Sequence, residues 1–493
     1  MFSTIFKKIG KNTAVYSIGN LLNRLIGFVM IPVYTRYLVP SDYGIVSLID
    51  ITINLAATII AIGLSGAVIR FYYDDDDPVQ KKLVISTSVI SMFMISIAAS
   101  SLFILFSQQI SYLVFDSGKY SKYLKIAFIT LFFEMLSQLT MSYIRAKQQS
   151  LRYSLFSLSK LLLGLSLNIY LIVFLEWGVW GVLYSGLITN GIVTVVLLSI
   201  TFAEVGFRFS LLKLQGMLKF GLPLIPSNIG MFILASSNMF FLQKYSTLSV
   251  VGTYSIGYKL GFAVNVIVVT PFLLFWSAYM YEIAKEKNAK ELFSKILEYV
   301  AFMLIIVVFG LSVIIGDVVK LLLASEYWGS ASVVPLIALT YLFWGLNCYF
   351  YLGINITKKT KYRSYSVTCG ALIALILNYL LIPLYGALGA AGSTALAYLL
   401  MTAMNYYFSQ RLYPIQYKFS RIVKMSIVSL FLFYVSKQLA SDLSAINVIL
   451  KVLILGFLPI ILWALGFYKE EEKQFIKRSF HNIRKRKDVL QHK

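Results

Sequence analysis

The chain has 493 residues, of which 59% are hydrophobic and 13% are charged, and its formal net charge is +23. Soluble globular proteins contain about 45–50% apolar and about 25% charged residues, so this composition excludes a soluble globular protein. Apolar segments of roughly 20 residues recur along the whole chain, which predicts an all-α polytopic membrane protein. A transmembrane barrel would instead show short segments that alternate in hydropathy.

Hydropathy along the chain predicts about 14 membrane-spanning helices. The first six spans are predicted at 13–35, 43–68, 83–106, 123–144, 155–175 and 179–202. A second set of six follows at 219–242, 251–277, 297–316, 332–356, 364–383 and 387–408. Two further spans are predicted at 422–440 and 446–467, ahead of a basic tail.

An internal repeat relates the two sets of six spans. At an offset of 208 residues, "RYLVPSDYGIVSL" (36–48) aligns with "KYSTLSVVGTYSI" (244–256), and the same offset pairs three glycines with three others: Gly44 with Gly252, Gly178 with Gly386, and Gly181 with Gly389. Because six is even, both halves enter the membrane in the same sense, as in transporters built from parallel repeats. We therefore predict two pseudo-symmetric six-helix bundles (1–208 and 209–415), two additional helices (416–468) and a cytoplasmic tail (469–493).

The basic residues predict the orientation. If the N-terminus is cytoplasmic, the even-numbered loops and both tails hold 34 of the 44 cations, against 8 in the odd-numbered loops. Cytoplasmic loops carry the excess of Lys and Arg, so both termini are predicted to be cytoplasmic. The net charge follows from this bias, and we expect anionic membrane lipids, not nucleic acid, beside the basic tail.

Four ionisable residues stand out as candidates inside predicted spans, namely Arg24, Asp50, Glu134 and Lys259. Such groups are costly in a bilayer and by default face a cavity or a partner. The helical rise places Asp50 and Lys259 at the same depth in the two halves, roughly 15 Å below the predicted outer turns near residues 40 and 248. Arg24 lies deeper, roughly 24 Å below the first of these turns.

Arginine binds phosphate well because its planar guanidinium donates several hydrogen bonds and keeps its charge when buried. Asn20 and Asn23 lie on the same helix face as Arg24. The hypothesis is that Asn20, Asn23, Arg24 and Lys259 contact an anionic substrate in a central cavity, while Asp50 and Glu134 are carboxylates for ion coupling. The alternative is structural: Arg24 pairs with Asp50, Lys259 reaches an interface, and Glu134 is protonated and hydrogen-bonded.

The motifs "YLVPSDYGIVSL" and "GLSGAVIRFYYD" within 12–75, with "LEWGVWGVLYSGLITN" (175–190) and "LYGALGAAGSTALAY", resemble those of bacterial polysaccharide-unit (Wzx-type) flippases. These belong to the multidrug/oligosaccharidyl-lipid/polysaccharide (MOP) exporter superfamily. The resemblance implies two bundles around a cationic V-shaped lumen, and export of undecaprenyl-diphosphate-linked units for O-antigen, lipopolysaccharide or capsule across the bacterial cytoplasmic (inner) membrane. It also implies partners, namely a polymerase and a chain-length regulator, and makes Arg70 and Arg145 candidates for the inner mouth.

No cofactor or metal is predicted, since both histidines, His481 and His492, lie in the tail; a proton or sodium gradient is left open as the energy source. Two other functions remain. A cation-coupled multidrug exporter would use Asp50 and Glu134, but the cations Arg24 and Lys259 oppose it. A polymerase or ligase would need paired catalytic groups in an ordered outer domain, and every predicted outer loop is short.

Overall fold

The computed structural model describes residues 27–438 and 445–467, and within these ranges the chain is helical, without strands. Three predicted substrate contacts, Asn20, Asn23 and Arg24, lie outside the described residues. The described chain has eleven helices long and apolar enough to span a membrane, together with the shorter apolar helix Leu453–Ala464. One of the eleven, Lys361–Leu412, consists of two helices. The number of spanning helices in the described residues therefore agrees approximately with the predicted 14.

The N-terminal half follows the predicted spans with one bend. Residues 27–37 are helical, and seven helices follow: α2 (Pro40–Ile60), α3 (Leu64–Tyr73), α4 (Pro78–Leu105), α5 (Ser107–Phe115), α6 (Ser121–Ala146), α7 (Ser150–Ile169) and α8 (Gly178–Val205). The predicted span 43–68 is not one straight helix, because Ile62 and Gly63 adopt positive φ and separate α2 from α3. The segment 107–122, predicted as an outer loop, contains the short helix α5.

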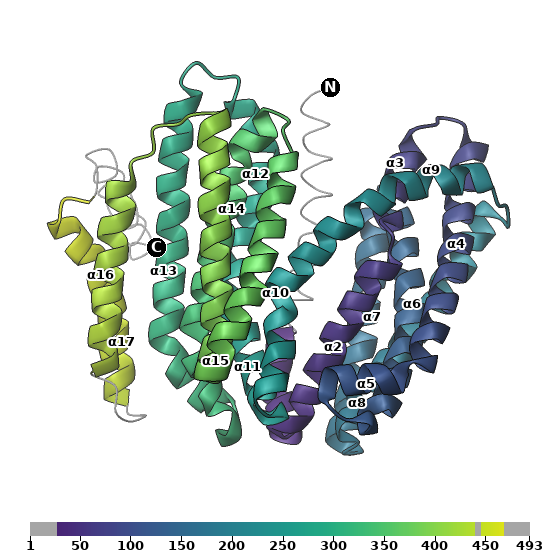
Figure 1. Cartoon of the computed structure of the whole chain (residues 1–493), viewed down its shortest axis with the longest axis horizontal. Helices are drawn as coiled ribbons and strands as arrows, with labels where there is room; N and C mark the ends of the chain where they lie inside the picture. Colours follow the sequence, from purple (N-terminus) through teal and green to yellow (C-terminus); the bar gives the residue numbers. More distant parts are fainter. Residues whose placement is uncertain (1–26, 439–444, 468–493) are drawn as a thin grey trace, which may run out of the picture.

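Helix α9 (Leu211–Gly221) leads from the N-terminal half to the C-terminal half, as Figure 1 shows. That half contains α10 (Ile225–Tyr245), α11 (Leu248–Gly261), α12 (Thr270–Ile283), α13 (Ala289–Leu322), α14 (Val334–Ile356) and α15 (Lys361–Leu412). The long α15 is two helices, because Gly386 has non-helical backbone angles three residues after Pro383. This break falls between the predicted spans 364–383 and 387–408.

The break in α15 has a counterpart in the first half, at the turn between α7 and α8. Gly178 at that turn has φ +54°, and Gly386 has φ +53°. Three residues later, Gly181 and Gly389 lie against the backbone of Leu171 and Leu381 respectively; a Cβ atom at Gly389 would collide with the Leu381 carbonyl oxygen, and one at Gly181 would be tightly packed. The glycine pairs at the 208-residue offset therefore form the same helical hairpin twice, which supports the pseudo-symmetry of the fold.

The two halves meet at one end and diverge toward the other (Figure 1). At the meeting end α2 packs against α11, and a buried cluster contains side chains from both halves: Ile31, Leu38, Tyr43, Ile172, Ile256, Ile315, Val319, Leu323, Tyr327 and Val334. We call these ten residues the closed-end cluster. Tyr327 also donates a hydrogen bond from its hydroxyl to the carbonyl oxygen of Leu38, 2.8 Å away, which links the halves directly.

The last two helices, α16 (Phe419–Gln438) and α17 (Ala445–Ala464), pack beside α13. Two ion pairs hold them there: Arg421 to Glu298 at 2.6 Å, and Lys451 to Asp317 at 2.6 Å. The sequence-based count had assigned Lys451 to an outer loop, and that assignment is wrong because the residue lies within α17 and is buried. The fold is thus two six-helix bundles with two extra helices attached to the second bundle.

Candidate translocation site

Lys259 is a cation that faces the space between the two halves. It lies on α11, where Ile256, Gly257 and Gly261 are buried, yet its own side chain is exposed. Its ammonium donates a hydrogen bond to the hydroxyl of Tyr43 on α2, 2.7 Å away, and lies 5.0 Å from the centre of that ring. The predicted intramembrane lysine is therefore held by a residue of the opposite half.

Asp50 faces the same space from α2. Leu48 and Ile49 are buried, whereas Asp50 is exposed and interacts electrostatically with Lys259 and Glu134. Among the described residues, no cation lies within 4 Å of the carboxylate of Asp50 or Glu134. Neither carboxylate is therefore neutralised by a direct ion pair within the described residues.

Glu134 lines a cavity of about 500 Å³ between α6, α7 and α8. Several polar side chains share its wall, among them Gln138, Lys160, Asn168, Thr189 and Asn190. Lys160 lies in the middle of α7 and interacts electrostatically with Glu134. Lys160 was counted with the loop cations in the sequence-based prediction, although "SLFSLSKLLLGLSLNIYLIVF" shows it embedded in an apolar run.

The two predicted inner-mouth arginines contact different partners. Arg70, in the last turn of α3, is exposed and lies 4.7 Å from the ring centre of Phe220. Arg145, in the last turn of α6, donates to the Ser142 hydroxyl at 2.7 Å and lies 5.8 Å from the ring centre of Tyr153. Since Tyr153 lines the α6–α8 cavity, Arg145 belongs to its surroundings and Arg70 does not.

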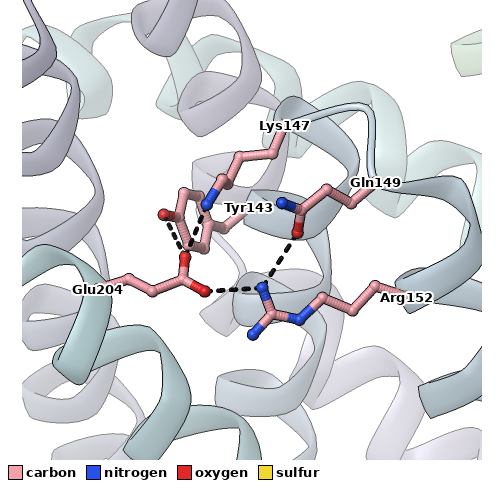
Figure 2. Close-up of polar contacts among 5 residues, drawn as sticks. All are labelled: Tyr143, Lys147, Gln149, Arg152 and Glu204. Carbon is pink, nitrogen blue, oxygen red and sulfur yellow. Dashed lines mark hydrogen bonds and ion pairs between the residues drawn. The ribbon is translucent and has the colours of Figure 1, made fainter.

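A compact ionic cluster fixes the ends of α6, α7 and α8 beside this cavity (Figure 2). The Glu204 carboxylate accepts hydrogen bonds from Lys147 at 2.7 Å, Arg152 at 2.7 Å and Tyr143 at 3.0 Å. Gln149 accepts a further bond from Arg152 at 3.1 Å. Because the Glu204 carboxylate on α8 pairs with cations at the end of α6 and the start of α7, we interpret this cluster as structural.

The comparisons agree on family and fold. A family model described as "Polysaccharide biosynthesis protein" matches residues 33–332. No curated protein matches the chain significantly. The family match confirms the resemblance to polysaccharide biosynthesis proteins inferred from the sequence motifs, and the solved structures below share the fold.

Three solved structures share the fold at low sequence identity. One is described as lipid II flippase MurJ in an inward closed conformation; it is 15% identical, with a TM-score of 0.74, over 92% of this chain and 99% of that one. Another is an inward-facing MATE family multidrug resistance transporter of the MOP superfamily, at 14% identity, TM-score 0.61, and coverage of 81% and 94%. A third is a MOP superfamily transporter from Pyrococcus furiosus, at 14% identity, TM-score 0.54, and coverage of 82% and 95%.

Proposed function

Because the chain belongs to the polysaccharide biosynthesis protein family, we propose that it is a flippase for oligosaccharide units linked to undecaprenyl diphosphate. It moves them from the cytoplasmic to the outer leaflet of the bacterial cytoplasmic membrane by alternating access of its two halves. Both termini are then cytoplasmic, and the end where the halves diverge faces the cytoplasm. The observation that carries this proposal is Lys259, an exposed cation between the halves that bonds to the opposite half.

The diphosphate is the part of the substrate that Lys259 would bind. A lysine ammonium is a compact charge with three donors, and it binds phosphate in many proteins. In the described residues only one of its hydrogen bonds, to Tyr43, is used by the protein. Arg24 remains the predicted second cation for the same diphosphate.

Tyr43 would transmit binding to the closed end. Its hydroxyl accepts from Lys259, while its buried ring packs edge-on against Tyr327, with 6.2 Å between ring centres. A phosphate oxygen that competes for the Lys259 ammonium removes one bond that holds Tyr43 in the closed-end cluster. Alternating access requires a ligand that binds the two states differently, and this competition supplies such a difference.

The membrane potential favours export of the anionic head group. Two negative charges that move outward across an inside-negative membrane gain roughly 4–5 kcal/mol per 100 mV. Inward movement of a proton or sodium ion bound to the carboxylate of Asp50 or Glu134 would add to the free energy available for export.

Complementation tests the proposed function. A strain that lacks this gene receives the wild-type chain, Lys259→Ala or Lys259→Arg, with membrane levels matched by immunoblot. We expect Lys259→Ala to lose surface polysaccharide and to accumulate lipid-linked units on the cytoplasmic side, while Lys259→Arg keeps part of the activity. Surface polysaccharide that persists in the deletion strain would refute the flippase proposal.

A multidrug exporter is the second candidate, favoured by the exposed carboxylate of Asp50, which has no ion-pair partner within 4 Å among the described residues. Cationic drugs would bind such a carboxylate, but Lys259 beside it would repel them. Drug susceptibility of the same deletion strain separates the two functions. A lowered resistance to cationic drugs, with normal polysaccharide, would favour the exporter.

A further inference from the structure

The cavity between α6, α7 and α8 has the size of a ligand site. Its volume is about 500 Å³, within the range of roughly 300–1,000 Å³ for small-molecule pockets. One water occupies about 30 Å³ of liquid, so the cavity is much larger than a single ion requires. It has room for a group of the size of a sugar ring.

The cavity wall has an excess of hydrogen-bond acceptors. The amide oxygens of Asn168 and Asn190 and the hydroxyl of Thr189 are buried and have no hydrogen-bond partner in the part of the chain that the structure describes. The side-chain amide nitrogen of each asparagine donates to a backbone carbonyl oxygen of its own helix: Asn168 to Gly164 at 3.0 Å, and Asn190 to Gly186 at 2.9 Å. Buried polar atoms normally have partners, so these three oxygens, which have none among the described residues, are candidates for hydrogen bonds from a ligand.

Two serine hydroxyls of the wall donate to backbone carbonyl oxygens. Ser137 donates to the carbonyl oxygen of Glu134 at 3.0 Å, and Ser185 to that of Val182 at 2.8 Å. The Glu134 carboxylate adds another acceptor with no ion-pair partner among the described residues within 4 Å. A ligand that brings several hydrogen-bond donors would satisfy these acceptors, and because Glu134 balances the charge of Lys160 in the same wall, the cavity favours a neutral group over a doubly charged diphosphate.

The remaining wall suits a carbohydrate. Tyr153 and Phe156, both on α7, offer aromatic faces for the apolar C–H faces of a sugar ring. Lys160 also lines the cavity, and its positive charge would repel a free metal cation there. Helix α7 forms one wall of the cavity and contributes no fully buried residue, so it is the helix that would have to shift for ligand hydroxyls to reach the shielded oxygens on α8.

A series of electrostatic interactions between charged side chains links the cavity to Lys259. Glu134 interacts electrostatically with Lys160 on one side and with Asp50 on the other, and Asp50 interacts with Lys259. On the basis of the proposed function, we propose that the α6–α8 cavity binds a neutral, hydroxyl-rich sugar residue of the transported unit while the diphosphate is at Lys259. The two sites together would select a glycan attached to a diphosphate.

Photo-crosslinking in living cells tests this directly. A benzophenone amino acid is placed at Phe156 in the full chain, expressed in the complemented deletion strain. Matched positions are Leu162 on the same helix, which is 50% exposed and does not line the cavity, and Asn54, exposed on α2 near Asp50. After irradiation, mass spectrometry of the purified protein identifies the attached molecule. We expect an adduct that contains sugar residues at Phe156 and none at Leu162.

The outcomes separate the cavity from the proposed function. A glycan adduct at Asn54 but not at Phe156 would overturn the sugar site and leave the flippase proposal standing. An adduct at Phe156 that contains lipid without sugar would also overturn it. Normal surface polysaccharide in the deletion strain, measured in parallel, would refute the flippase proposal itself.

A further substitution, Thr189→Val, tests whether the unpartnered oxygens of the cavity wall contribute to glycan binding. Thr189→Val keeps the shape of the side chain and removes one acceptor, and it should lower the glycan adduct at Phe156 by about twofold to tenfold. Ser199→Ala on the same helix is the control, since Ser199 is bonded to the Val195 carbonyl oxygen and does not line the cavity. Equal adduct yields in the two variants would contradict a role for Thr189.

Discussion

Gly44 and Gly252 touch backbone to backbone where α2 crosses α11, and the two are equivalent positions in the 208-residue repeat. A Cβ atom at Gly44 would collide with the carbonyl oxygen of Leu248, and one at Gly252 with that of Pro40. The contact therefore lies on the pseudo-symmetry axis and holds the closed end together. Any side chain there must push the two halves apart.

Gly44→Ala and Gly252→Ala should destabilise the closed end. Backbone atoms cannot yield as a flexible side chain does, so each substitution should cost about 1–3 kcal/mol, the usual cost of overpacking. A lower unfolding temperature of the purified protein in detergent measures this. Gly66→Ala on α3 is the control, because nothing lies within 4 Å of its Cβ position. Unfolding temperatures no lower than that of Gly66→Ala would contradict the account.

Tyr43→Phe should open the closed end while leaving the aromatic packing in place. The lost bond has a charged donor, and such bonds contribute about 1.5–3 kcal/mol, so the open population should rise about tenfold or more. Ser330→Cys, buried near the closed end, reports opening through its reaction with a membrane-impermeant thiol reagent. Identical labelling rates with and without the Tyr43→Phe substitution would show that the hydroxyl does not hold this end shut.

Asp50→Asn should remove the response to an ion gradient. The substitution preserves size and removes the charge that a proton or sodium ion would occupy, so basal flipping should persist while stimulation by an imposed gradient disappears. Asp42→Asn, on the same helix but in its first turn, is the control. Gradient stimulation that survives in Asp50→Asn would assign coupling to another group.

Glu298→Gln should loosen the attachment of α16. The side chains of Glu298 and Arg421 are only 6% and 15% exposed, and breaking a buried pair costs about 3–5 kcal/mol. Lys295→Met is the control, because its pair with Glu291 is largely exposed and contributes at most about 1 kcal/mol. Thermal unfolding compares the two variants, and equal shifts would mean that the buried pair adds no more than a surface pair.

The sequence predicted the spans and the repeat well because both depend on patterns that one chain displays by itself. Hydropathy located the helices, and the glycines at the 208-residue offset marked turns and close contacts. Lys160 was missed because the span was predicted to begin at residue 155, which placed Lys160 near the start of that span and made it resemble a loop cation. Helix α7 begins at Ser150, so Lys160 lies in its middle. The bond between Lys259 and Tyr43 could not be predicted, since it joins residues 216 positions apart through the packing of two halves.

Flipping by the purified protein tests the central claim most directly. The full chain is reconstituted into liposomes that contain the undecaprenyl-diphosphate-linked oligosaccharide, and an external glycosidase measures how fast the enclosed glycans reach the outside. The account predicts faster exposure than in protein-free liposomes, with Lys259→Ala at least about tenfold slower than wild type. Exposure no faster with the wild-type chain than without protein would contradict it.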